Sequence, residues 1–191
     1  MKMPVWVPAL LSMLWLTGCQ AAGSTASEKS PVKPQGAAII TPDVEWSAWQ
    51  KESASDLKCG DSKVLVGREH RGDEHGNSRI RCATVIQFEL LKTFNETRHD
   101  PVQSRNFNFT CPSPKVMIGR FSEGDENGTT GFYCVEYKDS WGDVLIPSET
   151  QTIQGKESDH QLLCNTNEVV IGSSHVGDEN ATTTYRCAQL F

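Results

Sequence analysis

Three short runs of apolar residues recur along the chain, and each predicts a buried β-strand. They are Val64-Leu65-Val66, Val116-Met117-Ile118 and Val169-Val170-Ile171. An unbroken run of β-branched or long apolar residues indicates a strand that is buried on both faces. A glycine closes each run, at Gly67, Gly119 and Gly172. A polar loop follows each glycine, and a second predicted strand follows the loop, around Ile80, Phe132 and Tyr185.

Further strands are predicted between these segments. Residues Asn106–Thr110 alternate polar and apolar positions, which places Phe107 and Phe109 on one face of a strand. Val85–Leu90 is a second candidate, rich in β-branched and apolar residues. No segment combines a helical period with capping residues. The pattern therefore predicts an all-β protein.

Pairs of cysteines bracket the strand–loop–strand segments and mark three copies of one module. The modules cover residues 59–82, 111–134 and 164–187, and successive copies are offset by 52 and then 53 positions. Repetition at this period indicates one supersecondary unit used several times around a shared core. We therefore expect a pseudo-threefold repeat domain with three to four short strands per repeat. It would be built either as a β-trefoil-like barrel or as a three-faced prism.

The six module cysteines are expected to form one bridge per module: Cys59–Cys82, Cys111–Cys134 and Cys164–Cys187. Six cysteines allow fifteen pairings, but their equal spacing in every copy favours the local ones. A straight hairpin centred on Asn127-Gly128 would hold the cysteines of its module roughly 30 Å apart, whereas a disulfide needs Cα atoms within about 7 Å. The first arm must therefore bend, for which we expect the Gly119 position. Metal ligation is the alternative use, although the chain has no Cys-x-x-Cys pair.

The first residues predict export and lipidation. Val5 to Leu16 is an apolar stretch that follows Lys2 and is too short to span a bilayer comfortably. It ends in Leu16-Thr17-Gly18-Cys19, which resembles the lipobox of bacterial lipoproteins. That resemblance implies cleavage before Cys19, acylation of this cysteine and, with Gln20 next, sorting to the outer membrane. The alternative is an ordinary secretory signal in which the cysteine occurs by chance.

These features divide the chain into three parts. Residues 1–18 form the signal peptide, residues 19–42 the lipidated cysteine with a flexible tether, and residues 43–191 the three-repeat β domain. The tether is mostly Ala, Gly, Ser, Thr, Lys and Pro, with almost nothing large and apolar before Ile39. Export would place the domain in a compartment that allows disulfides.

Charge and motifs exclude two broad classes of function. The formal net charge of −6 becomes −7 when Lys2 is removed with the signal peptide, and no basic or basic-aromatic run occurs. Both observations argue against a nucleic-acid partner. The chain has no Gly-x-Ser-x-Gly and no His-Glu-x-x-His. Adjacent Asp-Glu residues do not face each other across a substrate as a glycosidase pair does. We therefore expect a protein that is not an enzyme.

The polar loop of each module contains Gly-Asp-Glu and is the candidate ligand site. The candidate residues are Asp73, Glu74, Asp125, Glu126, Asn127, Asp178, Glu179 and Asn180. One interpretation is structural: the glycines supply positive φ and the aspartates cap backbone N–H groups. Carboxylates and amides also hydrogen-bond sugar hydroxyls, and clustered oxygens would suit calcium, although the spacing matches no EF-hand. A transition-metal site with His70 and His175 is a further alternative, in which the middle copy has Ser122.

The module resembles the repeats of dermatopontin and its invertebrate agglutinin relatives. The closest stretch runs from Phe107-Asn108-Phe109-Thr110-Cys111 to Gly131-Phe132-Tyr133-Cys134. The shared pattern is a cysteine, an apolar strand, a glycine, an acidic loop and an aromatic-x-Cys ending. The resemblance implies disulfide-stapled β repeats and adhesive binding, often to glycans or matrix. The loops differ, because those proteins have an Asp-Arg-x-Trp-type signature where this chain has Gly-Asp-Glu-Asn.

Taken together, the sequence predicts a non-catalytic binding module, anchored in the membrane of the cell envelope through a lipid. A polysaccharide or another glycan is the expected ligand, and three loops on one domain would gain strength by avidity. The alternative is a protein-interaction or structural lipoprotein, such as an assembly factor or an inhibitor. Its partner would be an envelope or extracellular protein, and the acidic loops would serve as scaffold. Neither hypothesis requires a cofactor. Calcium is the one ion that we expect the loops to suit.

Overall fold

The computed structural model describes residues 36–43, 46–73, 75–125, 127–178 and 180–191. The expected signal peptide, Cys19 and most of the expected tether lie outside these residues. Glu74, Glu126 and Glu179, one from each predicted loop, lie outside them as well. The described part of the chain is all-β, as the sequence predicts. It contains no helix of the length and apolarity that a membrane span requires.

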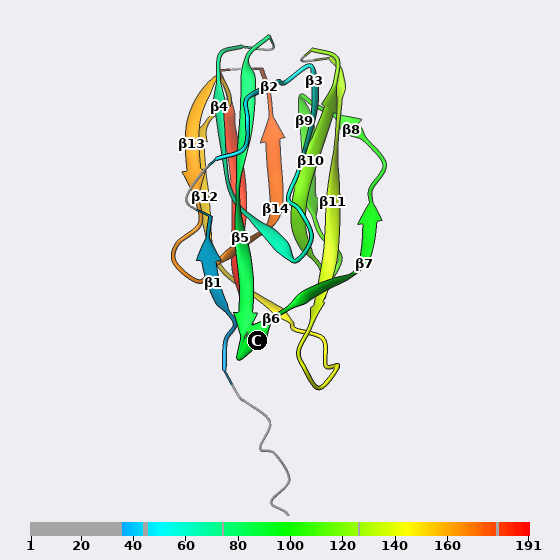
Figure 1. Ribbon diagram of the computed structural model, residues 1–191. Coiled ribbons are helices and arrows are strands. Elements are labelled where there is room, and N and C mark those ends of the chain that lie inside the picture. Colours follow the sequence, from blue (N-terminus) through cyan, green and yellow to red (C-terminus); the bar gives the residue numbers. More distant parts are fainter. Residues whose placement is uncertain (1–35, 44–45, 74, 126, 179) are drawn as a thin grey trace, which may run out of the picture. The chain divides into compact units, whose positions relative to one another are not determined.

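The described strands form two antiparallel sheets (Figure 1). The ten-stranded sheet follows the order β1-β5-β4-β13-β12-β15-β14-β9, with β2 and β6 also paired to β5. Its strands are β1 (Ile39–Pro42), β2 (Gln50–Lys51), β4 (Lys63–Arg71), β5 (Asn77–Gln87), β6 (Glu89–Leu90), β9 (Asn106–Thr110), β12 (Pro147–Lys156), β13 (Asp159–Leu163), β14 (Val169–Val176) and β15 (Thr182–Leu190). The five-stranded sheet contains β3 (Ala54–Lys58), β7 (Lys92–Arg98), β8 (Val102–Gln103), β10 (Val116–Glu123) and β11 (Thr129–Lys138).

The three modules are joined in a ring by the short strand that precedes each of them. Each module forms a central pair of long strands: β4–β5, β10–β11 and β14–β15. The strand before one module pairs with the first long strand of another: β3 with β10, β9 with β14, and β13 with β4. The register repeats as well, because Leu57, Phe109 and Leu162 lie opposite equivalent positions, namely Arg120, Ser173 and Arg68. This ring of antiparallel groups is compatible with the expected pseudo-threefold repeat.

The apolar triplets lie in the core, as predicted. In the first module Val64, Leu65 and Val66 are all buried, and the equivalent triplets of the other modules are buried too. The strands do not end at the glycines, however, because β4 continues past Gly67 to Arg71 and the equivalent strands continue in the same way. Four or more residues that the sequence assigned to each loop therefore belong to a strand. Most of these residues are buried, and the last one of each strand is exposed.

The repeated glycines mark close contacts between strands, and one of them gives a test of the packing. A Cβ added at Gly119 would lie 2.5 Å from the carbonyl oxygen of Leu57 and 2.8 Å from the Cα of Lys58. Because both neighbours are backbone atoms, we expect Gly119→Ala to lower the stability by about 1–3 kcal/mol. The control is Gly60→Ala, where a Cβ would meet nothing within 4 Å. Thermal unfolding should separate the two variants, and equal melting temperatures would contradict the close approach of β3 and β10.

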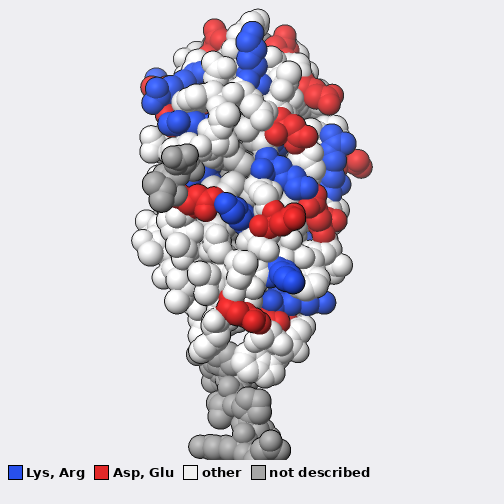
Figure 2. Space-filling model, in the orientation of Figure 1, with Lys and Arg blue, Asp and Glu red and all other residues white. Residues whose placement is uncertain are grey.

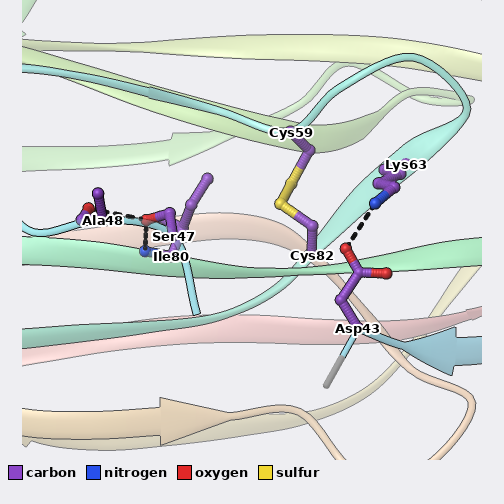
Figure 3. Close-up of a disulfide and its surroundings, with 7 residues drawn as sticks. All are labelled: Asp43, Ser47, Ala48, Cys59, Lys63, Ile80 and Cys82. Carbon is purple, nitrogen blue, oxygen red and sulfur yellow. Dashed lines mark hydrogen bonds and ion pairs between the residues drawn. A yellow bond between two sulfur atoms is a disulfide. The ribbon is translucent and has the colours of Figure 1, made fainter. Parts of the chain in front are cut away.

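The three predicted disulfides are confirmed. Their Cα atoms are 5.7, 5.8 and 5.7 Å apart in Cys59–Cys82, Cys111–Cys134 and Cys164–Cys187. Figure 3 shows the first bridge, which joins the residue after β3 to a residue inside β5. The first arm doubles back before its long strand begins, and the register of that strand also shifts next to the expected position, between Met117 and Gly119. In the second module the chain turns between Cys111, which follows β9, and Val116, where β10 begins.

The β domain begins earlier than residue 43. Strand β1 pairs with β5 and lies within the stretch that the sequence assigned to the tether. Ala38 and Ile40 are both buried, and the N–H of Ala38 donates to the carbonyl oxygen of Leu190 at 2.8 Å. The physical reason is the apolar pair Ile39-Ile40, since a strand alternates its side chains and so places Ile40 in the core. The stretch from Ala38 to Pro42 is therefore part of the domain.

Candidate functional site

The three Gly-Asp loops share one local geometry. Gly72, Gly124 and Gly177 have positive φ angles of 104°, 85° and 123°. An Oδ1 atom of the following aspartate accepts a hydrogen bond from the backbone N–H two residues later, at 3.0, 2.9 and 3.0 Å for Asp73, Asp125 and Asp178. Aspartate side chains stabilise turns in this way. One oxygen of each carboxylate therefore has the structural role expected from the sequence, because it caps a backbone N–H group of its own loop.

Backbone hydrogen bonds then hold the three loops together at one end of the domain. The N–H of Gly124 donates to the carbonyl of Ser53, that of Gly177 to Arg105, and that of Gly72 to Ser158, at 2.8, 2.9 and 2.7 Å. Each acceptor belongs to the turn that precedes a different module from the one containing the glycine. These hydrogen bonds therefore link the three modules in the same cyclic order as the pairing of the short strands does. All three hairpin tips lie at the upper end of Figure 1.

One pocket lies between the loops, and all three aspartates line it. Its volume is about 50 Å³, which is enough for a few water molecules or one polar group of a ligand. Segments from all three modules contribute to the lining: Glu52, His70, Asp73, Ser104, Arg105, Arg120, Ser122, Gly124, Asp125, Glu157, His175, Gly177 and Asp178. The candidate aspartates, which are more than fifty positions apart in sequence, therefore belong to one shared site.

The floor of the pocket is a cluster of buried charges. The carboxylate of Glu52 bridges two guanidinium groups, with Oε2 3.0 Å from Nη2 of Arg68 and Oε1 2.9 Å from Nη2 of Arg120. A second carboxylate, that of Glu157, lies 3.1 Å from Nη1 of Arg68. The Arg68 side chain is only 2% exposed. Two negative and two positive groups thus compensate one another in a place from which water is largely excluded.

Hydroxyl and imidazole groups complete the cluster. Nε of Arg120 donates to the hydroxyl of Thr130 at 2.6 Å, and Nη2 of Arg68 contacts the equivalent hydroxyl of Ser78 at 2.8 Å. Nη1 of Arg68 also lies 3.1 Å from Nε2 of His160. Buried guanidinium groups need several acceptors, because each N–H left without one costs free energy. The strands supply these acceptors at equivalent positions of two modules.

The charges of the cluster shift the titration of its members. Burial opposes ionisation of Glu52, but Arg68 and Arg120 outweigh it and hold the pKa of this carboxyl well below its usual range. The same balance of burial against the two arginines lowers the pKa of Glu157 to about 2. Burial, with the positive charge of Arg68, lowers the pKa of His160 to about 4. At neutral pH both carboxylates are therefore ionised and His160 is neutral.

The third module supplies a different floor. Ser173 stands where the other modules have Arg68 and Arg120, nine residues after the first cysteine. His175 contacts the carbonyl oxygen of Gly177 through Nε2 at 3.2 Å, and its Nδ1 is buried with no partner among the described residues. Nη1 of Arg120 and Oε2 of Glu157 also lack hydrogen-bond partners within the described part of the chain. All three side chains line the pocket, and these three atoms are themselves buried.

The described residues do not assemble a metal site. No group of three or more His, Cys, Asp or Glu side chains among them is placed to hold a metal ion. His70 and His175 both reach the pocket, but each contacts a carbonyl oxygen of its own loop through Nε2. The candidate amides of Asn127 and Asn180 are not among the residues that line the pocket. Asn127 instead accepts a hydrogen bond from Arg105 at 3.1 Å.

The charged floor was not predicted from the sequence, although a signal for it exists. Arg68 and Arg120 occupy the same position in two modules, directly after the repeated glycine. Glu52 and Glu157 likewise both lie seven residues before the first cysteine of a module. A charge that recurs at one position of a buried repeat would have indicated an internal ion pair.

Comparisons of the chain with protein-family models, curated proteins and solved structures gave no match. The three bridged, strand-rich segments fit a disulfide-bracketed repeat. The resemblance of these segments to dermatopontin-like repeats stays a hypothesis. The same is true of the resemblance of Leu16-Thr17-Gly18-Cys19 to the lipobox of bacterial lipoproteins.

Proposed function

We propose that the protein is a lipid-anchored lipoprotein of the cell envelope whose β domain is a non-catalytic binding module. The lipidated residue would be Cys19, and the outer membrane is the expected location. The pocket between the three Gly-Asp loops would bind one hydroxyl-rich unit of a polysaccharide or another glycan. The observation that carries the proposal is the convergence of all three aspartates on one pocket that is also lined by the charged side chains of Glu52, Arg120 and Glu157.

The chemistry of the pocket supports a ligand with hydroxyl groups. A sugar hydroxyl both donates and accepts hydrogen bonds, and the pocket offers both kinds of partner side by side. Asp178 and Glu157 provide acceptors, while the guanidinium of Arg120 provides a donor. Because these side chains are held by turns and ion pairs, little conformational entropy is lost when a ligand binds. With a volume of about 50 Å³, the pocket would take one edge of a sugar unit rather than a chain.

The second candidate function is interaction with an envelope or extracellular protein. Val176 lies next to Gly177 at the loop end and is 68% exposed, so it offers a protein partner an apolar contact there. One oxygen of each aspartate is already engaged within its own loop. In this case the loops would act mainly as scaffold, and a protein partner would cover one irregular side of the loop end.

Glycan binding can be tested with variants that keep the loop geometry. We expect Asp73→Asn, Asp125→Asn and Asp178→Asn combined to weaken glycan binding at least tenfold, because asparagine keeps the oxygen that caps the turn but removes the charge. The matched control combines Asp61→Asn, Glu89→Gln and Asp100→Asn, which are exposed and do not line the pocket. The measurement is an array of polysaccharide fragments probed with the full-length protein in detergent. Equal loss in both variants, or no binding by the native protein, would reject the glycan site and favour a protein partner.

A further inference from the structure

The end of the domain opposite the loops carries most of its exposed apolar side chains. Ten large hydrophobic residues are exposed among those described, and only Trp49, Val102 and Val176 lie towards the loop end. The other seven are 41–82% exposed and form what we term the apolar end: Ile39, Phe88, Leu90, Phe94, Trp141, Ile146 and Phe191. A gathering of this kind on a soluble domain marks an interaction surface.

The topology explains why these residues meet. Strands β5, β11 and β15 all start at a loop and run away from it, so the residues after each strand emerge at the far end. Phe88 and Leu90 follow β5, Trp141 follows β11, and Phe191 follows β15. In Figure 1 this is the lower end, where β6 and the C-terminus lie. Each module thus contributes apolar side chains to the same surface.

Strand pairing joins several of these side chains into one surface. Ile86 lies opposite Ile39 on one side and opposite Leu90 on the other, so the three side chains share a face. Ile146 and Phe191 exchange two backbone hydrogen bonds, of 2.8 and 3.1 Å. On the face shown in Figure 2, most charged side chains lie over the upper and middle parts of the domain, and the lower left part is largely uncharged.

The most exposed member is held at the tip of a tight hairpin. Phe88 connects β5 to β6, is 82% exposed and has a φ of 66°. A bulky residue rarely adopts a positive φ, which glycine or asparagine would take at lower cost. Folding alone therefore does not explain a phenylalanine at this tip. A phenyl ring that projects from a strained turn is explained by a partner that takes it up.

The chain also enters the domain at the apolar end. Gly36 is the first described residue, and its carbonyl oxygen accepts a hydrogen bond of 2.9 Å from the side chain of Gln87, the neighbour of Phe88. Gly36 is 17 residues after Cys19, a stretch that spans at most roughly 60 Å. A lipid on Cys19 would therefore bring the bilayer to this end of the domain first.

We propose that the apolar end rests on the phospholipid bilayer, with Phe88, Leu90 and Trp141 inserted at the level of the headgroups. This inference rests on the lipid anchor at Cys19 in the proposed function. Tryptophan and phenylalanine are the side chains that proteins place at the membrane interface. The tether makes the contact effectively intramolecular, so that a small apolar surface is enough. The pocket between the Gly-Asp loops then faces away from the membrane.

Tryptophan fluorescence in the full-length, lipidated protein tests this orientation. The variant Trp46→Phe with Trp49→Phe leaves Trp141 as the only tryptophan after residue 18. In phosphatidylcholine vesicles that contain brominated acyl chains, we expect at least twofold more quenching of Trp141 than in unbrominated vesicles. The matched variant, Trp141→Phe, keeps Trp46 and Trp49 near β2 and should show little quenching. Adding Phe88→Asp and Leu90→Asp should reduce the quenching of Trp141 while the protein still floats with the vesicles.

The outcomes separate the anchor from the contact. A protein that floats with vesicles but whose Trp141 is not quenched would overturn the bilayer contact and leave the anchor intact. A native protein that does not float, or a Cys19→Ser variant that floats equally well, would reject the anchor and with it this proposal. In the absence of lipid, the emission of Trp141 could instead shift to shorter wavelengths as the protein concentration rises. That result would overturn the bilayer contact and show that the apolar end binds a second copy of the chain.

Discussion

Replacing Glu52 by glutamine is expected to lower the free energy of unfolding by about 3–5 kcal/mol. Its carboxylate is the one that bridges Arg68 and Arg120, at 3.0 and 2.9 Å. The substitution keeps the size of the side chain but leaves two buried guanidinium groups with Glu157 as their remaining carboxylate partner in the cluster. An uncompensated buried charge has a large desolvation cost, which no rearrangement of neighbouring hydroxyls offsets.

The control for this prediction is an ion pair of the same residue types at the surface. Glu149 accepts a hydrogen bond of 3.0 Å from Arg186, and both side chains are 36% exposed. Glu149→Gln should therefore cost less than about 1 kcal/mol. Urea unfolding of both variants gives the comparison. Similar small losses would mean that water reaches the floor of the pocket and that the cluster is not a low-dielectric site.

Removing one disulfide should have the second largest effect. We expect Cys111→Ala with Cys134→Ala to lower stability by about 3 kcal/mol, because the bridge restricts the unfolded chain across a loop of this length. Both cysteines are buried, and alanine avoids placing new hydroxyl groups in the core. The bridge also holds the turn at which the chain passes from β9 to β10.

The measurement is thermal unfolding with and without dithiothreitol. The native protein in reductant should melt at a lower temperature than in its absence, and the double variant should respond less to the reductant than the native protein does. A variant that melts like the native protein would show that this bridge contributes nothing to stability. Glycan binding should be retained in the folded variant, because the pocket lies at the loop end, away from the bridge.

The fold could be predicted largely because the three copies repeat their hydrophobic pattern. The apolar triplets fixed the first long strand of each module, and the equal cysteine spacing fixed the disulfides. The end of each strand was missed because Gly67 and its equivalents were interpreted as strand ends. A glycine can instead allow a neighbouring strand to approach closely, which a single sequence does not distinguish from a turn. Strand β1 was missed because an apolar pair is a weak signal within a Pro- and Gly-containing stretch.

The candidate site was predicted in part. The aspartates were recognised because they recur, and the structure brings all three to one pocket. The sequence predicted three loops that gain strength by avidity and not one shared pocket, since sequence spacing does not show that each loop is fixed by a turn from another module. Glu52 and Glu157 lie in those turns, outside the bracketed segments, and their partners Arg68 and Arg120 lie beyond the glycines. The charged floor therefore arises only from the ring of modules.

The ring has a consequence for how such a domain can change. Because the strand before each module completes the sheet of another, no single copy contains a whole folding unit, and loss of one copy would leave unpaired edges on the other two. The three copies are therefore needed together, although each can be substituted independently of the others. Ser173, in the place of an arginine, shows that one copy can diverge while the framework stays intact. Because all three copies line one pocket, a single substitution in any copy alters the shared site. Its specificity for a ligand can therefore change without a change of fold.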